Sequence, residues 1–152
     1  MSLYADILRQ SHLIIHSKDS VTDKMQAICD MLDARLEHYD WTGFYLSDIE
    51  KRRLHLGPYT GEATEHTTIS YGKGICGQAA EAEKTFLIDD VTAEKNYIAC
   101  SIHVKSEIVV PIIKSGIVVG QIDIDSHKPA AFTDNDQQLL EEICAELATY
   151  IE

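Results

Sequence analysis

Two cysteines and three acidic residues gather within about a third of the chain, and together they could carry out thiol chemistry on a small cation. Cys76 lies between two glycines, and Cys100 follows in a segment without regular periodicity. Glu107 comes next, and Asp123 and Asp125 lie two residues apart further on. A cysteine thiolate is a nucleophile, whereas a carboxyl group binds an ammonium group or donates a proton. The sequence therefore predicts a nucleophilic thiol beside an acidic binding site.

The three acidic residues are expected to face one cavity. Asp123 and Asp125 share a face of a predicted strand because side chains at i and i+2 point the same way. A short hairpin turn at 114–116, which contains a glycine, folds the two strands around it together and places Glu107 opposite residues 121–125. Neighbouring carboxylates raise the pKa of at least one of them. We therefore expect a site that holds an ammonium group while one acid stays protonated; a solvated face at the strand end is the alternative.

The four cysteines fall into two groups. Cys29 and Cys144 lie on the apolar stripes of predicted helices, so we expect them to be buried thiols. Cys100 lies in a predicted loop, where a thiol is accessible, and His103 either lowers its pKa or is simply a surface histidine. Cys76 falls at the start of a predicted helix, which favours a thiolate; a small residue needed for a tight turn is the alternative.

Cofactor motifs are weak in this chain. Gly72-x-Gly74-x-x-Gly77 is similar to a dinucleotide fingerprint, but no second parallel strand–helix–strand unit with an acidic partner accompanies it. The spacings of cysteine and histidine match no common metal site. We expect neither a metal nor an organic cofactor. Trp41, the one tryptophan, begins a predicted strand and is expected either to pack in the core or to wall a pocket.

Helices at both ends and strands between them predict an α+β fold, with an antiparallel sheet of about six strands flanked by N- and C-terminal helices. The last helix has the clearest start, because Thr133 and Asp136 form a capping-box pattern. Its apolar stripe, from Leu139 to Ile151, is expected to have area to spare for a partner. Helices are expected at 3–16, 21–39, 77–84 and after Thr133, and strands at 41–46, 53–56, 67–71, 86–88, 107–113 and 117–124.

The length and the net charge of the chain limit its domain count and the classes of partner that it could bind. The 152 residues fit a single domain spanning 1–152. The net charge of −12 disfavours nucleic acid and anionic membrane surfaces as partners. No apolar run approaches the roughly 18–20 residues that cross a bilayer, and the first residues do not read as a signal peptide. We therefore expect a cytoplasmic protein, in which four cysteines are thiols rather than structural disulfides.

Several short runs together resemble the free methionine-(R)-sulfoxide reductases, which are GAF-domain enzymes. The similarity covers roughly residues 40–126, and related forms of some runs also occur in GAF sensor domains. The runs are Trp41-x-Gly43-Phe44-Tyr45, Leu56-Gly57-Pro58, Gly74-Ile75-Cys76-Gly77, Ile98-Ala99-Cys100, Ser106–Pro111 and Gly120-x-Ile122-Asp123-Ile124-Asp125-Ser126.

This resemblance implies a role for each matching residue. Cys100 would attack the sulfoxide sulfur. Glu107, Asp123 and Asp125 would hold the ammonium group of the substrate and protonate the sulfoxide oxygen. Trp41 would pack on the methyl end. Such a site would select free methionine sulfoxide over a residue inside a peptide, which lacks a free amino group.

The resemblance also implies the rest of the cycle and its partners. Methionine would be released, and Cys100 would become a sulfenic acid. A second thiol would condense with the sulfenic acid to form a disulfide, which a thioredoxin-like dithiol would reduce. The family's usual cysteine ten residues before Cys76 is His66 here, so Cys76 is the candidate resolving thiol. Tyr97 and Ser101 also depart from the family's usual residues. A homodimer is expected, and the alternative function is a non-catalytic GAF module that senses a small molecule or redox state.

Overall fold

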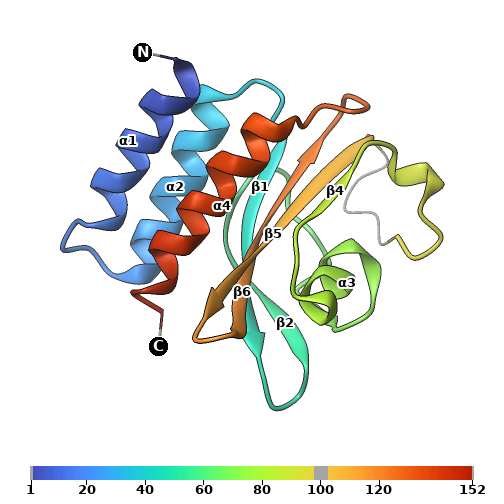
Figure 1. The fold of residues 1–152 in the computed structure, drawn as a ribbon. Coiled ribbons are helices and arrows are strands. Elements are labelled where there is room, and N and C mark those ends of the chain that lie inside the picture. Colours follow the sequence, from blue (N-terminus) through green and yellow to red (C-terminus); the bar gives the residue numbers. More distant parts are fainter. Residues whose placement is uncertain (1, 98–102, 152) are drawn as a thin grey trace.

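The computed structural model describes residues 2–97 and 103–151, which form one six-stranded antiparallel sheet and four α-helices (Figure 1). The strand order is β3-β2-β1-β6-β5-β4. The predicted α+β architecture is therefore confirmed. The elements are α1 (Leu3–Ile15), α2 (Val21–Arg35), β1 (Trp41–Asp48), β2 (Arg53–Thr60), β3 (Thr68–Ser70), α3 (Gly74–Ala82), β4 (Phe86–Ile88), the 3₁₀ turn η1 (Val91–Ala93), β5 (Ser106–Lys114), β6 (Ile117–Ser126) and α4 (Asp134–Ala148).

Helices cover both faces of this sheet. The terminal helices α1, α2 and α4 lie on one face, and α3 lies on the other (Figure 1). The central strand β6 is consequently buried on both sides, and its side chains alternate between the two cores. Ile122 and Ile124 belong to the core under the terminal helices. Asp123 and Asp125 therefore face the α3 side.

The β5–β6 hairpin closes as predicted, through a tight two-residue turn. Ser115 and Gly116 both have positive φ, 54° and 79°, which is the geometry that favours glycine in a short hairpin. The register then shifts once, between Ile112 and Ile113, before Glu107 pairs with Asp125. The turn chemistry and one bulge thus fix which residues meet at the far end of the hairpin.

Helix α4 begins with the predicted capping box. The Thr133 side chain accepts a hydrogen bond from the backbone of Asn135, and Asp136 accepts one from the backbone of Thr133 at 2.9 Å. The expectation of spare apolar area on this helix is wrong, because its stripe packs against the chain's own sheet. The buried stripe residues are Leu139, Leu140, Ile143, Cys144, Leu147 and Ile151.

Helix α2 and strand β2 are among the elements whose lengths differ from the predictions. Helix α2 ends at Arg35, before the predicted residue 39, because Leu36 adopts extended backbone that leads into β1. Strand β2 continues to Thr60, past Pro58. The proline is tolerated because it falls where the β1–β2 register shifts, at a position that needs no ladder hydrogen bond.

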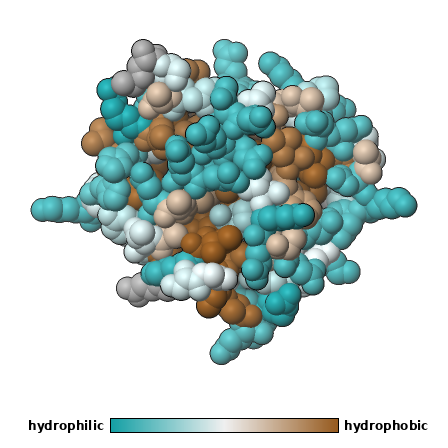
Figure 2. All heavy atoms as spheres, viewed as in Figure 1, coloured by the Kyte–Doolittle hydropathy of each residue, from teal (hydrophilic) through white to brown (hydrophobic). Residues whose placement is uncertain are grey.

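Hydrophilic side chains cover most of the face drawn in Figure 2, broken by smaller hydrophobic areas. None of the helices in the described ranges combines the length and the apolar character needed to traverse a bilayer. The three described cysteines outside the 98–102 segment, Cys29, Cys76 and Cys144, are free and buried, as expected for Cys29 and Cys144.

Candidate active site

Glu107, Asp123 and Asp125 lie together on the α3 side of the sheet. Glu107 on β5 is directly opposite Asp125 on β6, and Asp123 is the next residue on the same face. Each of the three is at most 4% exposed. The structure thus brings together the three acids that the sequence predicted to meet, and it removes them from solvent rather than leaving them on a solvated face.

Helix α3 places the thiol of Cys76 against these acids. Cys76 is buried in the first turn, and its Sγ donates to Glu107 Oε2 over 3.8 Å. One side-chain atom each from Cys76, Glu107 and Asp123 lies within 4.8 Å of the other two. A small cavity opens at this point. Its remaining lining residues are Tyr45, His66, Ile69, Lys73, Gly74 and Ile75.

Burial has the largest effect on the pKa of Asp123. It raises the pKa of Asp123, and hydrogen bonds with Glu107 and Cys76 only partly oppose it. Within the described part of the chain, no cation contributes to that balance. A buried carboxylate without a cation is costly, so the ligand-free site favours a protonated acid.

The Cys76 thiol is not the thiolate that its place at a helix start suggested. Burial raises its pKa well above the usual value, and the charges of Asp123, Glu107 and Asp125 raise it further. A helix N-terminus stabilises an anion by only about 0.3–1 kcal/mol at an ordinary site, so burial and three neighbouring acids prevail over it.

The glycine motif shapes the turn that leads into α3. Gly72 and Gly74 have positive φ, 86° and 62°. A Cβ on Gly77 would lie 2.5 Å from the Ser70 carbonyl oxygen, so this position also requires glycine. The spacing therefore serves a tight turn, and α3 starts at Gly74 rather than at the predicted residue 77.

Asn96 stabilises this turn through hydrogen bonds, and that role was not predicted from the sequence. Its Oδ1 accepts from the Gly74 backbone at 3.0 Å, and its Nδ2 donates to the Gly72 carbonyl at 2.6 Å. Gln78 also donates to the Asn96 carbonyl. The only available signal was the tendency of asparagine to bond nearby backbone in loops, and that tendency names no partner.

Trp41 lies on the same face as the acids, directly opposite Asp125 across β1 and β6. Its ring stacks on Tyr59 with centroids 5.5 Å apart, and its indole N–H donates to the Glu62 carbonyl at 2.9 Å. The ring also covers Gly43, where an added Cβ would meet it at 2.3 Å. Trp41 is thus buried and fixed next to the acids, although it does not line the small cavity.

Cys100 lies outside the described residues, so its accessibility and its pairing with Cys76 stay predictions. His103 is exposed, and its ring lies 5.8 Å from that of His127, consistent with a surface histidine. His66, at the position of the family's usual third cysteine, is half-buried and lines the cavity, and its carbonyl accepts from the Tyr45 hydroxyl.

Fold and site together match the GAF domain family, whose model covers residues 18–152. The chain belongs to this family. Within it, the chain groups with the free methionine-R-sulfoxide reductases. The relative of that name from Escherichia coli is 34% identical over 144 residues, covering 95% of this chain and 86% of the relative.

Two further relatives show the range of the likeness. GAF domain-containing protein A from Dictyostelium discoideum is 34% identical over 140 residues, covering 92% of this chain and 87% of the relative. The X-ray structure of free methionine-R-sulfoxide reductase from Neisseria meningitidis, in complex with its substrate, has a TM-score of 0.92 and 32% identity. That match covers 97% of this chain and 87% of the other.

Proposed function

We propose that this protein reduces free L-methionine-(R)-sulfoxide to methionine. The observation that carries the proposal is the cluster of three buried acids beside a buried thiol, in a chain that resembles reductases of this name. One substrate ammonium group supplies the positive charge that the buried cluster favours. A residue within a peptide has no such group, so the site selects the free amino acid.

The first chemical step needs a thiol and a proton donor. Cys100 attacks the sulfoxide sulfur while a protonated acid, for which Asp123 has the raised pKa, donates its proton to the sulfoxide oxygen. The hydroxyl then passes to the Cys100 sulfur as the bond between the two sulfurs and the substrate S–O bond break, so that Cys100 becomes a sulfenic acid and methionine leaves. Sulfur of the substrate is reduced, and sulfur of Cys100 is oxidised by the same two electrons.

The second step regenerates the thiol. Cys76 attacks the sulfenic sulfur of Cys100, the S–S bond forms, and the hydroxyl leaves as water. The Cys76 proton passes to Glu107, whose carboxylate already accepts from that thiol, and Glu107 gives it to the leaving hydroxyl. Because the pKa of Cys76 is raised, this proton transfer is required before the attack. A thioredoxin-like dithiol then reduces the Cys76–Cys100 disulfide.

Substrate entry requires side-chain movement. The cavity volume is about 10 Å³, which is close to the space for one water molecule. Lys73 is exposed and His66 half-exposed on the wall of this cavity, so the exposed side of the cavity is the one that they line. An amino acid therefore binds by widening the cavity from its exposed side.

We also propose that the protein is cytoplasmic, consists of a single domain and forms a homodimer. The three free thiols suit the reducing cytoplasm, and a single domain accounts for the one sheet with its helices on both faces. A homodimer formed through the terminal helices would use their outer surface, where Leu3 and Leu13 are exposed. Light scattering of the purified protein tests the dimer by its molar mass.

Turnover assays test the enzyme. The protein with dithiothreitol should release methionine from the free R sulfoxide, and it should leave the S sulfoxide and N-acetylmethionine sulfoxide unchanged. Cys100→Ser should abolish the release. Retention of the ligand without turnover would reject the reductase and favour the alternative, a GAF module that senses a small molecule.

A further inference from the structure

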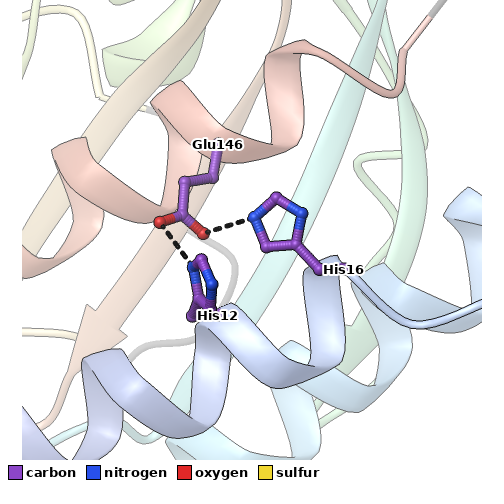
Figure 3. Close-up of side chains that lie close together, drawn as sticks. All are labelled: His12, His16 and Glu146. Atoms are coloured by element: carbon purple, nitrogen blue, oxygen red, sulfur yellow. Dashed lines mark hydrogen bonds and ion pairs between the residues drawn. The ribbon is translucent and has the colours of Figure 1, made fainter.

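Two histidines and a glutamate converge at the ends of two terminal helices, on the sheet face opposite to the acidic cluster (Figures 1 and 3). His12 lies in the last turn of α1, and His16 caps it. Glu146 lies in the last turn of α4. Figure 3 shows one imidazole ring directed at each carboxylate oxygen of Glu146.

The separations between these atoms suit a shared metal ion. His12 Nδ1 lies 3.2 Å from Glu146 Oε1, and His16 Nε2 lies 3.6 Å from Glu146 Oε2. Bonds of 2.0–2.1 Å at tetrahedral angles place two zinc ligands about 3.3 Å apart. All three donor atoms lie within 4.8 Å of one another, so a small closing movement completes the geometry.

The surroundings of the cluster also resemble those of a ligand set. Glu146 Oε2 is buried, and no described residue gives it a hydrogen bond. The other ring nitrogen of His16 lies 2.7 Å from the Tyr150 hydroxyl, which fixes the ring as outer partners of metal-bound histidines do. Side chains four residues apart on a helix share one face, which is how α1 directs both rings to the same point.

Local charge favours a cation here. The C-terminal ends of α1 and α4 both lie at this corner, and each carries the negative end of a helix dipole (Figure 1). Glu146 adds a formal charge. Lys24 opposes them, because its Nζ lies 3.6 Å from the centroid of the Tyr150 ring. The two helix ends and the carboxylate outnumber this one ammonium group.

We propose that His12, His16 and Glu146 bind a divalent transition-metal ion such as Zn²⁺, which ties the C-terminal end of α1 to that of α4. Two imidazoles and one carboxylate suit Zn²⁺ rather than Mg²⁺, which prefers oxygen ligands alone. The exposed side chains of both histidines leave room for water to complete the coordination. The site serves stability and takes no part in the reductase reaction.

Calorimetric titration with Zn²⁺ tests the site on the full chain, reduced and stripped with a chelator. The parent protein should bind one equivalent more than the double variant His12→Gln/His16→Gln. The variant His55→Gln is the matched control, because the His55 side chain is 45% exposed and lies 3.8 Å from a carboxylate oxygen, that of Asp48. It should bind as many equivalents as the parent. Circular dichroism checks that each variant folds.

Two further readouts separate this site from the cysteines. At a free Zn²⁺ concentration 100 times the dissociation constant, the folded-to-unfolded ratio of the parent should rise about 100-fold, and the double variant should lose that rise. Co²⁺ bound at this site should show no thiolate charge-transfer absorption. Equal numbers of Zn²⁺ equivalents in the parent and the double variant would overturn the proposal and leave the cluster as an ion pair only, as would a Glu146→Gln variant that binds unchanged.

Discussion

Glu107 and Asp125 face each other directly across β5 and β6, although both are acidic and almost fully buried. Like charges in this position destabilise a sheet. A proton on one of them, or a cation between them, removes the repulsion. An ammonium ligand would supply such a cation.

Asp125→Asn should make the ligand-free protein more stable, by about 1 kcal/mol, because it removes one of two opposed charges. The same change should weaken binding of free methionine sulfoxide, since the site loses a charge that holds the ammonium group. Urea unfolding with and without ligand measures both effects. Asp33→Asn, at an exposed position on α2, should alter neither; a destabilised Asp125→Asn protein that binds normally would contradict the prediction.

Asp123 should make the protein less stable as pH rises. Its folded-state pKa is raised, so the folded state binds more protons than the unfolded state above about pH 4. The free energy of unfolding therefore falls from about pH 4 up to the folded-state pKa. Asp123→Asn should flatten this fall, which unfolding curves at pH 5 and pH 8 would measure. An unchanged difference between the two pH values would show that Asp123 titrates normally.

Cys76 should react slowly with iodoacetamide in the folded protein at pH 8, at least tenfold more slowly than in urea. Burial and three neighbouring acids raise its pKa, and only the thiolate reacts. Glu107→Gln should speed the labelling because it removes one of those charges. Mass spectrometry of labelled peptides follows each cysteine separately. Glu83→Gln, at an exposed C-cap, serves as the control and should not change the rate.

The sequence predicted the strand pairing that forms this site better than it predicted the pKa values of the side chains in the site. The i, i+2 spacing of Asp123 and Asp125 and the hairpin turn were enough to place Glu107 beside them, because strand geometry is local. The pKa of Cys76 could not be predicted in the same way. It depends on how deeply α3 packs onto the sheet, and that is decided by contacts between segments far apart in the chain.

The same distinction between local geometry and contacts of distant segments explains which helix predictions were wrong. The capping box located the start of α4, since caps involve neighbouring residues. The apolar stripe from Leu139 to Ile151 could not reveal whether the chain's own sheet or a partner would cover it. Asn96 was missed because its partners, Gly72 and Gly74, lie more than twenty residues away.

Gly43→Ala should displace the Trp41 ring, because the new Cβ would lie 2.3 Å from it. We expect weaker substrate binding and a shifted fluorescence spectrum, which reports on Trp41 alone since the chain has one tryptophan. Gly57→Ala is a milder control, with its nearest contact at 3.2 Å. An unshifted spectrum together with normal turnover in Gly43→Ala would exclude Trp41 as a wall of the substrate site.

Asp136 should be the main acid-sensitive link between the two ends of the chain. It is buried, and it accepts hydrogen bonds from Tyr4, Tyr39 and His38 at 2.8–2.9 Å. Burial raises its pKa, but the bonds from His38, the Thr133 backbone and the two tyrosines outweigh burial and leave the pKa lowered. Its contribution to stability is therefore complete above about pH 4 and is lost as pH falls through the folded-state value.

Asp136→Ala should accordingly lower the free energy of unfolding at pH 7 by about 2–4 kcal/mol, since it removes a helix cap and leaves buried hydroxyl groups without an acceptor. The loss should shrink below pH 4, where Asp136 of the parent becomes protonated. Denaturation at pH 7 and pH 3 measures the difference. Asp134→Ala changes an exposed acid in the same first turn of α4, so it should cost at most a few tenths of that amount. Equal effects of the two substitutions would mean that the general charge of the helix start, and not the buried network, provides the stability.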